Sequence, residues 1–216
     1  MRDVSDEFVS EFVNACREAG QRGLMRCSSG NMSRRVDEER MLVTATRCWM
    51  SRLTADDVVL CRIADGAVLD GPDPTVEINL HAGILLARPD IDVVMHFQSP
   101  CATTLACRDV SQVNYFVIPE IAYYLGAIGY VPYLPPGSTE LADAAAEVMR
   151  QHNLAIMANH GQVTAARDFD QVIQNAEFFE LACRIILQGG DGVTPLTEEA
   201  ADALIAAGPG GSRSRV

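Results

Sequence analysis

Two histidines and a glutamine in the sequence could bind a metal ion, although they come from distant segments. His96 and Gln98 lie two residues apart in VVMHFQS, so in a strand their side chains point to the same face. His160 lies in ANHGQ, where Gly161 lets the backbone approach closely. Because imidazole is a common ligand of divalent transition metals, His96 and His160 are candidate ligands. The simpler alternatives are a core histidine and a surface-loop histidine.

An acid completes the set of residues that could do chemistry. Glu77 begins a predicted helix of otherwise apolar character, where a carboxylate could simply stabilise the helix N-terminus. Beside a divalent metal the same group could bind the ion or move a substrate proton. His81 follows one helical turn later on the same face, so a Glu77–His81 metal pair competes with His81 as a core or supporting residue. His152 ends a later helix and is interpreted as structural.

The elements that must position these residues alternate between the two periodicities. Apolar residues at helical spacing predict helices, and alternating or continuous apolar runs bounded by turn residues predict strands. Helices are expected over 5–24, 75–90, 102–108, 139–152 and 168–190. Strands are expected within 27–36, where a Ser-Gly-Asn turn enters a short strand, over 41–47, over 53–71 as a pair turning at Asp65-Gly66, over 92–99, and over 153–166 as a second pair. We expect an α/β fold of three layers, with helices on both sides of a central, mainly antiparallel sheet.

One domain is expected over residues 1–192, followed by a short acidic helix and a disordered tail in residues 193–216. The chain of 216 residues is 48% apolar, which is enough for a sizeable core. Its seven cysteines are odd in number and form no CxxC pair, which argues against a disulfide framework or a cysteine-rich zinc module.

The net charge and the hydropathy of the chain limit the classes of partner and the cellular location that can be expected. The net charge of −12 disfavours nucleic acid and anionic membranes. A small anion could still be held by local arginines or helix N-termini. No stretch approaches roughly 18 uninterrupted apolar residues, and the acidic start lacks the pattern of a signal peptide. A cytoplasmic protein is therefore expected.

Six ordered blocks of sequence resemble the class II aldolase/adducin family, especially the bacterial L-fuculose-1-phosphate aldolases. The resemblance spans roughly residues 8 to 190. The blocks are SGNMS at 29–33, VTATR at 43–47, TVEINLHAGILLARPD at 75–90, MHFQSPCATTLA at 95–106, IPEIAYYLGAIGYVPY at 118–133 and ANHGQVTAAR at 158–167.

The resemblance implies a metal site with one departure. In that family three histidines hold a zinc ion and an acid transfers a proton. His96 and His160 match the first and third ligands and Glu77 matches the acid, but Gln98 replaces the second histidine. Either the Gln98 amide oxygen binds the ion, which lowers affinity or changes the preferred metal from Zn²⁺ to another divalent cation such as Mn²⁺ or Co²⁺, or metal and catalysis have been lost. We favour the first.

The resemblance also implies a phosphate pocket, which is only partly matched. Asn31 and Thr46 stand where the family contacts phosphate, and Thr75 replaces one serine. Val76 replaces the neighbouring serine, and Arg47 stands in place of a glycine. Because a guanidinium can bind a phosphate or a carboxylate through paired hydrogen bonds, Arg47 leaves the substrate's acid open.

Tyr123 matches a tyrosine that the fuculose-type enzymes send into a neighbouring subunit's site as a proton donor. The resemblance therefore implies a homotetramer with sites between subunits, although an interface role for Tyr123 is an equal alternative. The family's C-terminal tyrosine has no counterpart in the tail AAGPGGSRSRV.

The expected function is metal-dependent aldol cleavage of a small keto-sugar phosphate into dihydroxyacetone phosphate and an aldehyde through an enediolate. One alternative uses the same fold and metal chemistry for decarboxylation, epimerisation or dehydration of a related sugar or keto-acid. The other is a non-catalytic, adducin-like binding module.

Overall fold

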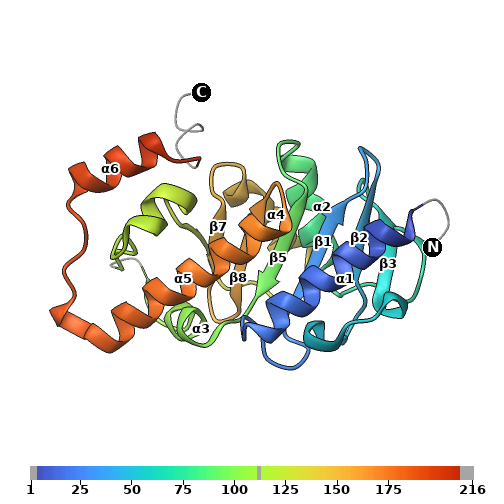
Figure 1. Cartoon of the computed structure of the whole chain (residues 1–216), viewed down its shortest axis with the longest axis horizontal. Coiled ribbons are helices and arrows are strands. Elements are labelled where there is room, and N and C mark those ends of the chain that lie inside the picture. Colours follow the sequence, from blue (N-terminus) through green and yellow to red (C-terminus); the bar gives the residue numbers. More distant parts are fainter. Residues whose placement is uncertain (1–3, 111–112, 210–216) are drawn as a thin grey trace.

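A single eight-stranded sheet forms the centre of the computed structural model, which describes residues 4–110 and 113–209 (Figure 1). The strand order is β4-β3-β2-β1-β5-β8-β7-β6, and every neighbouring pair is antiparallel except β6 and β7. The strands are β1 (Asn31–Arg35), β2 (Arg40–Thr44), β3 (Val58–Arg62), β4 (Val68–Asp70), β5 (Val93–Phe97), β6 (Gly129–Val131), β7 (Leu154–Met157) and β8 (Gly161–Ala166).

Helices cover both faces of the sheet, so the predicted three-layer arrangement is confirmed. One core lies between the sheet and α1 (Asp6–Gln21), α3 (Pro100–Ala106) and α5 (Phe169–Gly189). The second lies between the sheet and α2 (Ile78–Ala87) and α4 (Thr139–Met149). In Figure 1 the long α5 and α1 cross the near face, with α2 behind the sheet.

Local sequence signals account for the helix starts. Ser5 accepts a hydrogen bond from the backbone N–H of Phe8 at the start of α1, and Asp168 accepts one from Gln171 at the start of α5. Each of these caps satisfies an amide that the first helical turn leaves without a partner. α2 is apolar on nearly every side because it is packed between the sheet and α4.

Strand register brings β1, β5 and the β7–β8 turn together at one end of the central strands, and the start of α2 joins them there. On the face under α2 and α4, Asn31 of β1 is paired with His96 of β5. On β5's other side, Phe97 is opposite Gln162, so the end of β5 lies beside the turn before β8. Glu77 immediately precedes α2. The residues singled out above therefore converge from β1, β5, α2 and the β7–β8 turn.

The remaining segments are short. Three 3₁₀ turns occupy Met50–Arg52, Ala55–Asp57 and Gly190–Gly192, and a π-helical turn occupies Ile121–Leu125, where the sequence had predicted no regular element. The acidic helix expected after residue 192 is α6 (Glu198–Ala207), which packs against the π-helical turn at one end of the molecule. The disorder predicted for the tail concerns mainly residues 210–216, outside the described ones. None of the described helices has the length and apolar character needed to cross a bilayer.

Candidate metal centre

Glu77, His96 and His160 form a cluster that could hold one ion. The Nε2 atom of His96 lies 3.4 Å from Glu77 Oε2, and Nε2 of His160 lies 3.4 Å from Glu77 Oε1. The candidate ligand atoms of the three residues all lie within 4.8 Å of one another. His96 is 1% and Glu77 5% exposed, so the cluster is shielded from solvent.

The ring of His96 is oriented from behind. Its Nδ1 is 2.9 Å from the backbone carbonyl oxygen of Gln162, so Nδ1–H donates to that oxygen and Nε2 keeps its lone pair for the cluster. Such a bond from the non-ligating nitrogen fixes the ring and tautomer of most metal-binding histidines. The Gln162 contact was not found from the sequence, because it depends on the pairing of β5 with β8.

A chain of hydrogen bonds holds the carboxylate of Glu77. Asn31 Nδ2 donates to Glu77 Oε2 over 2.8 Å. His81 Nε2, 2.6 Å from Asn31 Oδ1, donates to that oxygen, and Ser33 Oγ donates to His81 Nδ1 over 2.8 Å. Both ring nitrogens of His81 are thus engaged, which favours the supporting role over the competing Glu77–His81 pair. Ser33 lies in SGNMS, but nothing in the sequence indicated its partner.

One buried atom of the cluster lacks what a cation would supply. Glu77 Oε1 has no hydrogen-bond partner among the described residues, although it is fully buried. A buried acceptor without a partner is costly. Two imidazole nitrogens and a carboxylate oxygen also form a donor set suited to zinc and similar ions. The residues present therefore fit a divalent metal.

The charges of the cluster match this donor set. Burial raises the pKa of Glu77. The charge of His96, the hydrogen bond from Asn31 and the charge of His160 lower it, and together they outweigh burial, so the pKa lies below its usual value. Burial and then the charge of His96 lower the pKa of His160 to about 4, against the opposing effect of Glu77. Near neutral pH the carboxylate is ionised and the His160 imidazole is neutral, which are the forms that bind metals.

Gln98 contacts the turn that carries His160. Its Nε2 donates to the backbone carbonyl oxygen of His160 over 2.7 Å. The amide orientation is thereby fixed, and Oε1 is the atom left for another interaction. The coordination of an ion by Gln98 stays a prediction, and the observed bond adds a second role, which is to anchor the turn.

Gly161 is needed because three groups crowd its α-carbon. A Cβ at this position would lie 2.7 Å from Gln98 Cγ, 2.7 Å from the Phe97 carbonyl oxygen and 3.1 Å from His96 Cε1. We expect Gly161→Ala to lower the free energy of unfolding by about 1–3 kcal/mol through overpacking and to weaken metal binding. Urea denaturation and metal titration measure the two effects. Gly192→Ala is the control, because a Cβ there meets nothing within 4 Å; equal effects of the two variants would contradict this account.

The predicted substrate-binding residues lie on two adjacent segments beside Glu77. The backbone N–H of Thr46 donates to the backbone carbonyl oxygen of Asp73 over 3.0 Å, and that of Thr75 donates to the backbone carbonyl oxygen of Thr44 over 3.0 Å. Thr75 Oγ1 also accepts from the backbone N–H of Glu77 over 3.3 Å. Asn31 joins them, but its side chain is occupied by Glu77 and His81. Phosphate contacts by these residues stay predictions.

Backbone strain gathers around the same segments. Arg47 is exposed and has a φ of 59°, in the left-handed region that non-glycine residues seldom adopt. Asn159, directly before His160, has a φ of 54°. Strain of this kind persists where the surrounding structure enforces it, often at ligand sites.

Tyr123 is not brought to the cluster within this chain. It lies in the π-helical turn, its ring meets that of Tyr124 edge-on at 4.8 Å, and its backbone lies against Gly208. No contact joins Tyr123 to Glu77, His96 or His160 among the described residues. A role in a neighbouring subunit's site stays a prediction.

The burial of neutral His81 predicts a pH dependence of stability. Burial lowers its pKa to about 3, whereas an unfolded histidine has a pKa of about 6.5. The unfolded chain therefore binds a proton that the folded one refuses, so stability is full above pH 6.5 and falls as the pH drops toward 3. In metal-free protein, His81→Gln should reduce the loss of unfolding free energy between pH 7 and pH 5.5 by about 1 kcal/mol.

Urea denaturation at the two pH values measures this loss. His152→Gln is the control, because the His152 side chain bonds only to the Ala127 carbonyl oxygen among the described residues, and its backbone carbonyl, which accepts from Arg88, is unchanged by the substitution. An unchanged pH dependence in His81→Gln would show that His81 is not buried in its neutral form.

A family model, characterised relatives and a solved structure all match most of the chain. Residues 10–187 match the family described as Class II Aldolase and Adducin N-terminal domain. Over 192 residues the chain is 30% identical to the 3-oxo-tetronate 4-phosphate decarboxylase of Escherichia coli (strain K12), covering 87% of this chain and 90% of that enzyme. Over 172 residues it is 31% identical to the L-fuculose phosphate aldolase of Methanococcus maripaludis, covering 80% and 92%. The crystal structure of YgbL from Escherichia coli superimposes with a TM-score of 0.86 at 25% identity, covering 92% and 98%.

Proposed function

The chain belongs to the class II aldolase and adducin family, and we propose that it is a metal-dependent decarboxylase. Its substrate would be a small, phosphorylated 3-keto sugar acid. The observation that carries the proposal is the buried cluster of Glu77, His96 and His160, whose donor set fits a divalent cation. The similarity to decarboxylases that act on 3-oxo-tetronate 4-phosphate favours loss of CO₂ over aldol cleavage, which the sequence alone had favoured.

Both reactions break a carbon–carbon bond next to a carbonyl group and leave negative charge on its oxygen. His96 and His160 would hold the ion with Glu77 beside it, and Zn²⁺, Mn²⁺ and Co²⁺ are the candidates. When bound, the ion supplies Lewis-acid stabilisation of that developing charge. The neutral imidazole of His160 adds no positive charge that would repel the ion, and the shielded site excludes competing water.

Glu77 is the residue that would move the proton. Its Oε2 is engaged by Asn31, so Oε1 is the atom that would carry a proton to the carbon that has lost CO₂. Because loss of CO₂ from a carboxylate consumes one proton, Glu77 would first take that proton up from solvent. Asn31 and the backbone bond to Thr75 hold this carboxylate in place, so that little reorganisation is needed during transfer.

Arg47 would bind an acidic group of the substrate. It stands where the resemblance places a glycine, and its guanidinium suits a carboxylate or phosphate through paired hydrogen bonds. Arg47→Asn should lower kcat/KM by about 10–100-fold, mainly through KM, because a charge-assisted interaction contributes about 1.5–3 kcal/mol. Asparagine is chosen because it tolerates the left-handed backbone. Steady-state kinetics with an unchanged KM would remove Arg47 from the binding site.

Aldol cleavage of a keto-sugar phosphate is the second candidate. The similarity to an L-fuculose phosphate aldolase supports it, as does Tyr123 if a neighbouring subunit of a homotetramer supplies that phenol. A non-catalytic binding module is the weakest candidate, because such a protein has no need of a buried acid and two histidines that converge.

A substrate panel separates these candidates. The protein would be incubated with 3-oxo-tetronate 4-phosphate and with L-fuculose 1-phosphate, each with added Zn²⁺, Mn²⁺ or Co²⁺, while CO₂ and dihydroxyacetone phosphate are measured. The proposal predicts CO₂ from the first compound and little cleavage of the second. Loss of CO₂ from the first compound also leaves dihydroxyacetone phosphate, so the aldolase would be supported only by release of that product from L-fuculose 1-phosphate without CO₂ from the first compound. Inactivity toward both compounds with every metal would contradict the proposed function.

A further inference from the structure

A polar cavity lies at the strand ends opposite those that carry the metal centre. Its volume is about 270 Å³, and it is bounded by the segments before β5 and after β8 and by the first turns of α5. The metal centre lies at the Phe97 end of β5 and the Gly161 end of β8. The cavity lies at their other ends, about 15 Å away for strands of this length. No residue of the metal cluster lines it.

Asn175 gives this cavity an unmet hydrogen bond. The residue is 1% exposed, lines the cavity from α5, and its Oδ1 has no hydrogen-bond partner among the described residues. Because buried polar atoms are nearly always paired, an orphaned acceptor that faces an open cavity indicates a place for a ligand's donor group. A hydroxyl or ammonium group would satisfy it.

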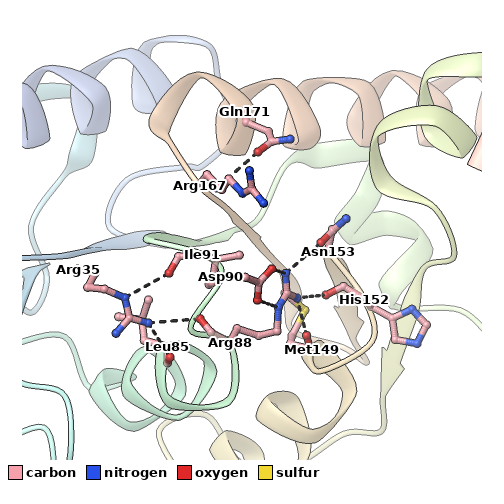
Figure 2. Close-up of polar contacts among 10 residues, drawn as sticks. All are labelled: Arg35, Leu85, Arg88, Asp90, Ile91, Met149, His152, Asn153, Arg167 and Gln171. Atoms are coloured by element: carbon pink, nitrogen blue, oxygen red, sulfur yellow. Dashed lines mark hydrogen bonds and ion pairs between the residues drawn. The ribbon is translucent and has the colours of Figure 1, made fainter. Parts of the chain in front are cut away.

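Arg167 gives the same cavity a surplus positive charge. Arg167 is exposed, and no acidic partner lies within ion-pair distance of it in the described part of the chain. Its backbone N–H donates to Gln171 Oε1 over 3.5 Å. Figure 2 shows its side chain on the side of α5 that faces Asp90 and Asn153, which line the cavity too.

The other two arginines in Figure 2, Arg35 and Arg88, both donate hydrogen bonds to backbone carbonyl oxygens of the protein. Arg88 binds both carboxylate oxygens of Asp90, over 2.7 and 3.1 Å, and donates to the Met149 and His152 carbonyl oxygens. The charge of Asp90 is therefore balanced by Arg88. The nearby Asp168 is engaged in capping α5. The charge of Arg167 remains available for an anion.

We propose that this cavity is a second small-molecule site, which binds a small hydroxycarboxylate. The carboxylate would accept paired hydrogen bonds from the Arg167 guanidinium, and the hydroxyl would donate to Asn175 Oδ1. The site would be separate from catalysis, because its ligand could not reach the metal centre. The inference does not depend on which reaction the metal centre performs.

Calorimetric titration of the full chain with L-malate, and with succinate as the analogue that lacks the hydroxyl, tests the site. Malate should bind, and succinate should bind several-fold more weakly because it leaves Asn175 Oδ1 unpaired. Arg167→Gln should weaken malate binding by about tenfold or more. The matched control is Arg150→Gln, which removes the same charge from an exposed ion pair on the surface.

Three results would overturn the proposal. The first is no measurable binding of malate. The second is equal affinity in Arg167→Gln and the unaltered protein, which would place the ligand elsewhere, including at the metal centre. The third is binding that appears only when the chain is shortened to end at Pro209, because Pro209 lines the cavity and residues 210–216 would then be its natural occupant.

Discussion

Glu77→Gln is expected to lower kcat by about 10²–10⁴-fold while the protein keeps its metal. Glutamine has nearly the same shape and can still contact Asn31, but it cannot take up a proton at the position of Oε1. The two imidazoles remain to hold the ion. Steady-state kinetics and elemental analysis of the same preparation measure the two properties together.

Glu147→Gln is the matched control for this change, because Glu147 is an exposed residue paired only with Arg150 in the recorded ion pairs. It should leave kcat and metal content unchanged. Full activity of Glu77→Gln would refute the proton-transfer role. Loss of metal together with activity would instead make Glu77 chiefly a ligand of the ion.

His160→Ala is expected to remove both the ion and the activity. His160 supplies one of the two imidazole nitrogens of the cluster, and even the loss of a partner behind a ligand weakens metal binding by about 10–100-fold. Removal of the ligand itself should therefore weaken binding by more than about 100-fold. Because the site without an ion cannot stabilise charge on the substrate oxygen, turnover should fall to background.

His152→Ala is the matched control, since it removes an imidazole that lies outside the cluster. Competition with a chelator, followed by colour or fluorescence, gives the affinity of each variant. Unchanged affinity in His160→Ala would mean that the ion, if any, is bound elsewhere.

The positions of the main elements could be predicted from the sequence because the relevant signals are local. The long apolar run around His81, ended by Pro89, marks α2, and the shorter continuous apolar run around His96 marks a central strand. Turn residues such as Gly66, with a φ of 69°, mark the hairpin between β3 and β4. The convergence of His96 with His160 could be expected only from the resemblance, since spacing alone does not place distant segments together.

The supporting contacts could not be predicted, because they arise from tertiary packing. The sequence does not show that Asn31 and His81 form the hydrogen-bond chain that orients Glu77, or that the backbone carbonyl of Gln162 orients His96. It also gives no sign that Gln98 bonds to the carbonyl of His160. Each of these contacts joins residues that are distant in the chain.

The choice of reaction was the weakest sequence inference for a chemical reason. Aldol cleavage and decarboxylation make the same demand on the ion and on Glu77, so residues of the cluster cannot distinguish them. The difference lies in which group leaves the substrate, and hence in residues such as Arg47 and Tyr123. Arg47 was the signal that a carboxylate could be involved.

The most direct test of the central claim is a crystal structure of the protein soaked with Zn²⁺, with diffraction recorded on both sides of the zinc absorption edge. We predict one anomalous peak within about 2.0–2.2 Å of Nε2 of both His96 and His160, with a carboxylate oxygen of Glu77 beside it. A structure at full soak in which these nitrogens contact no ion, or in which the two imidazoles face apart, would contradict the account.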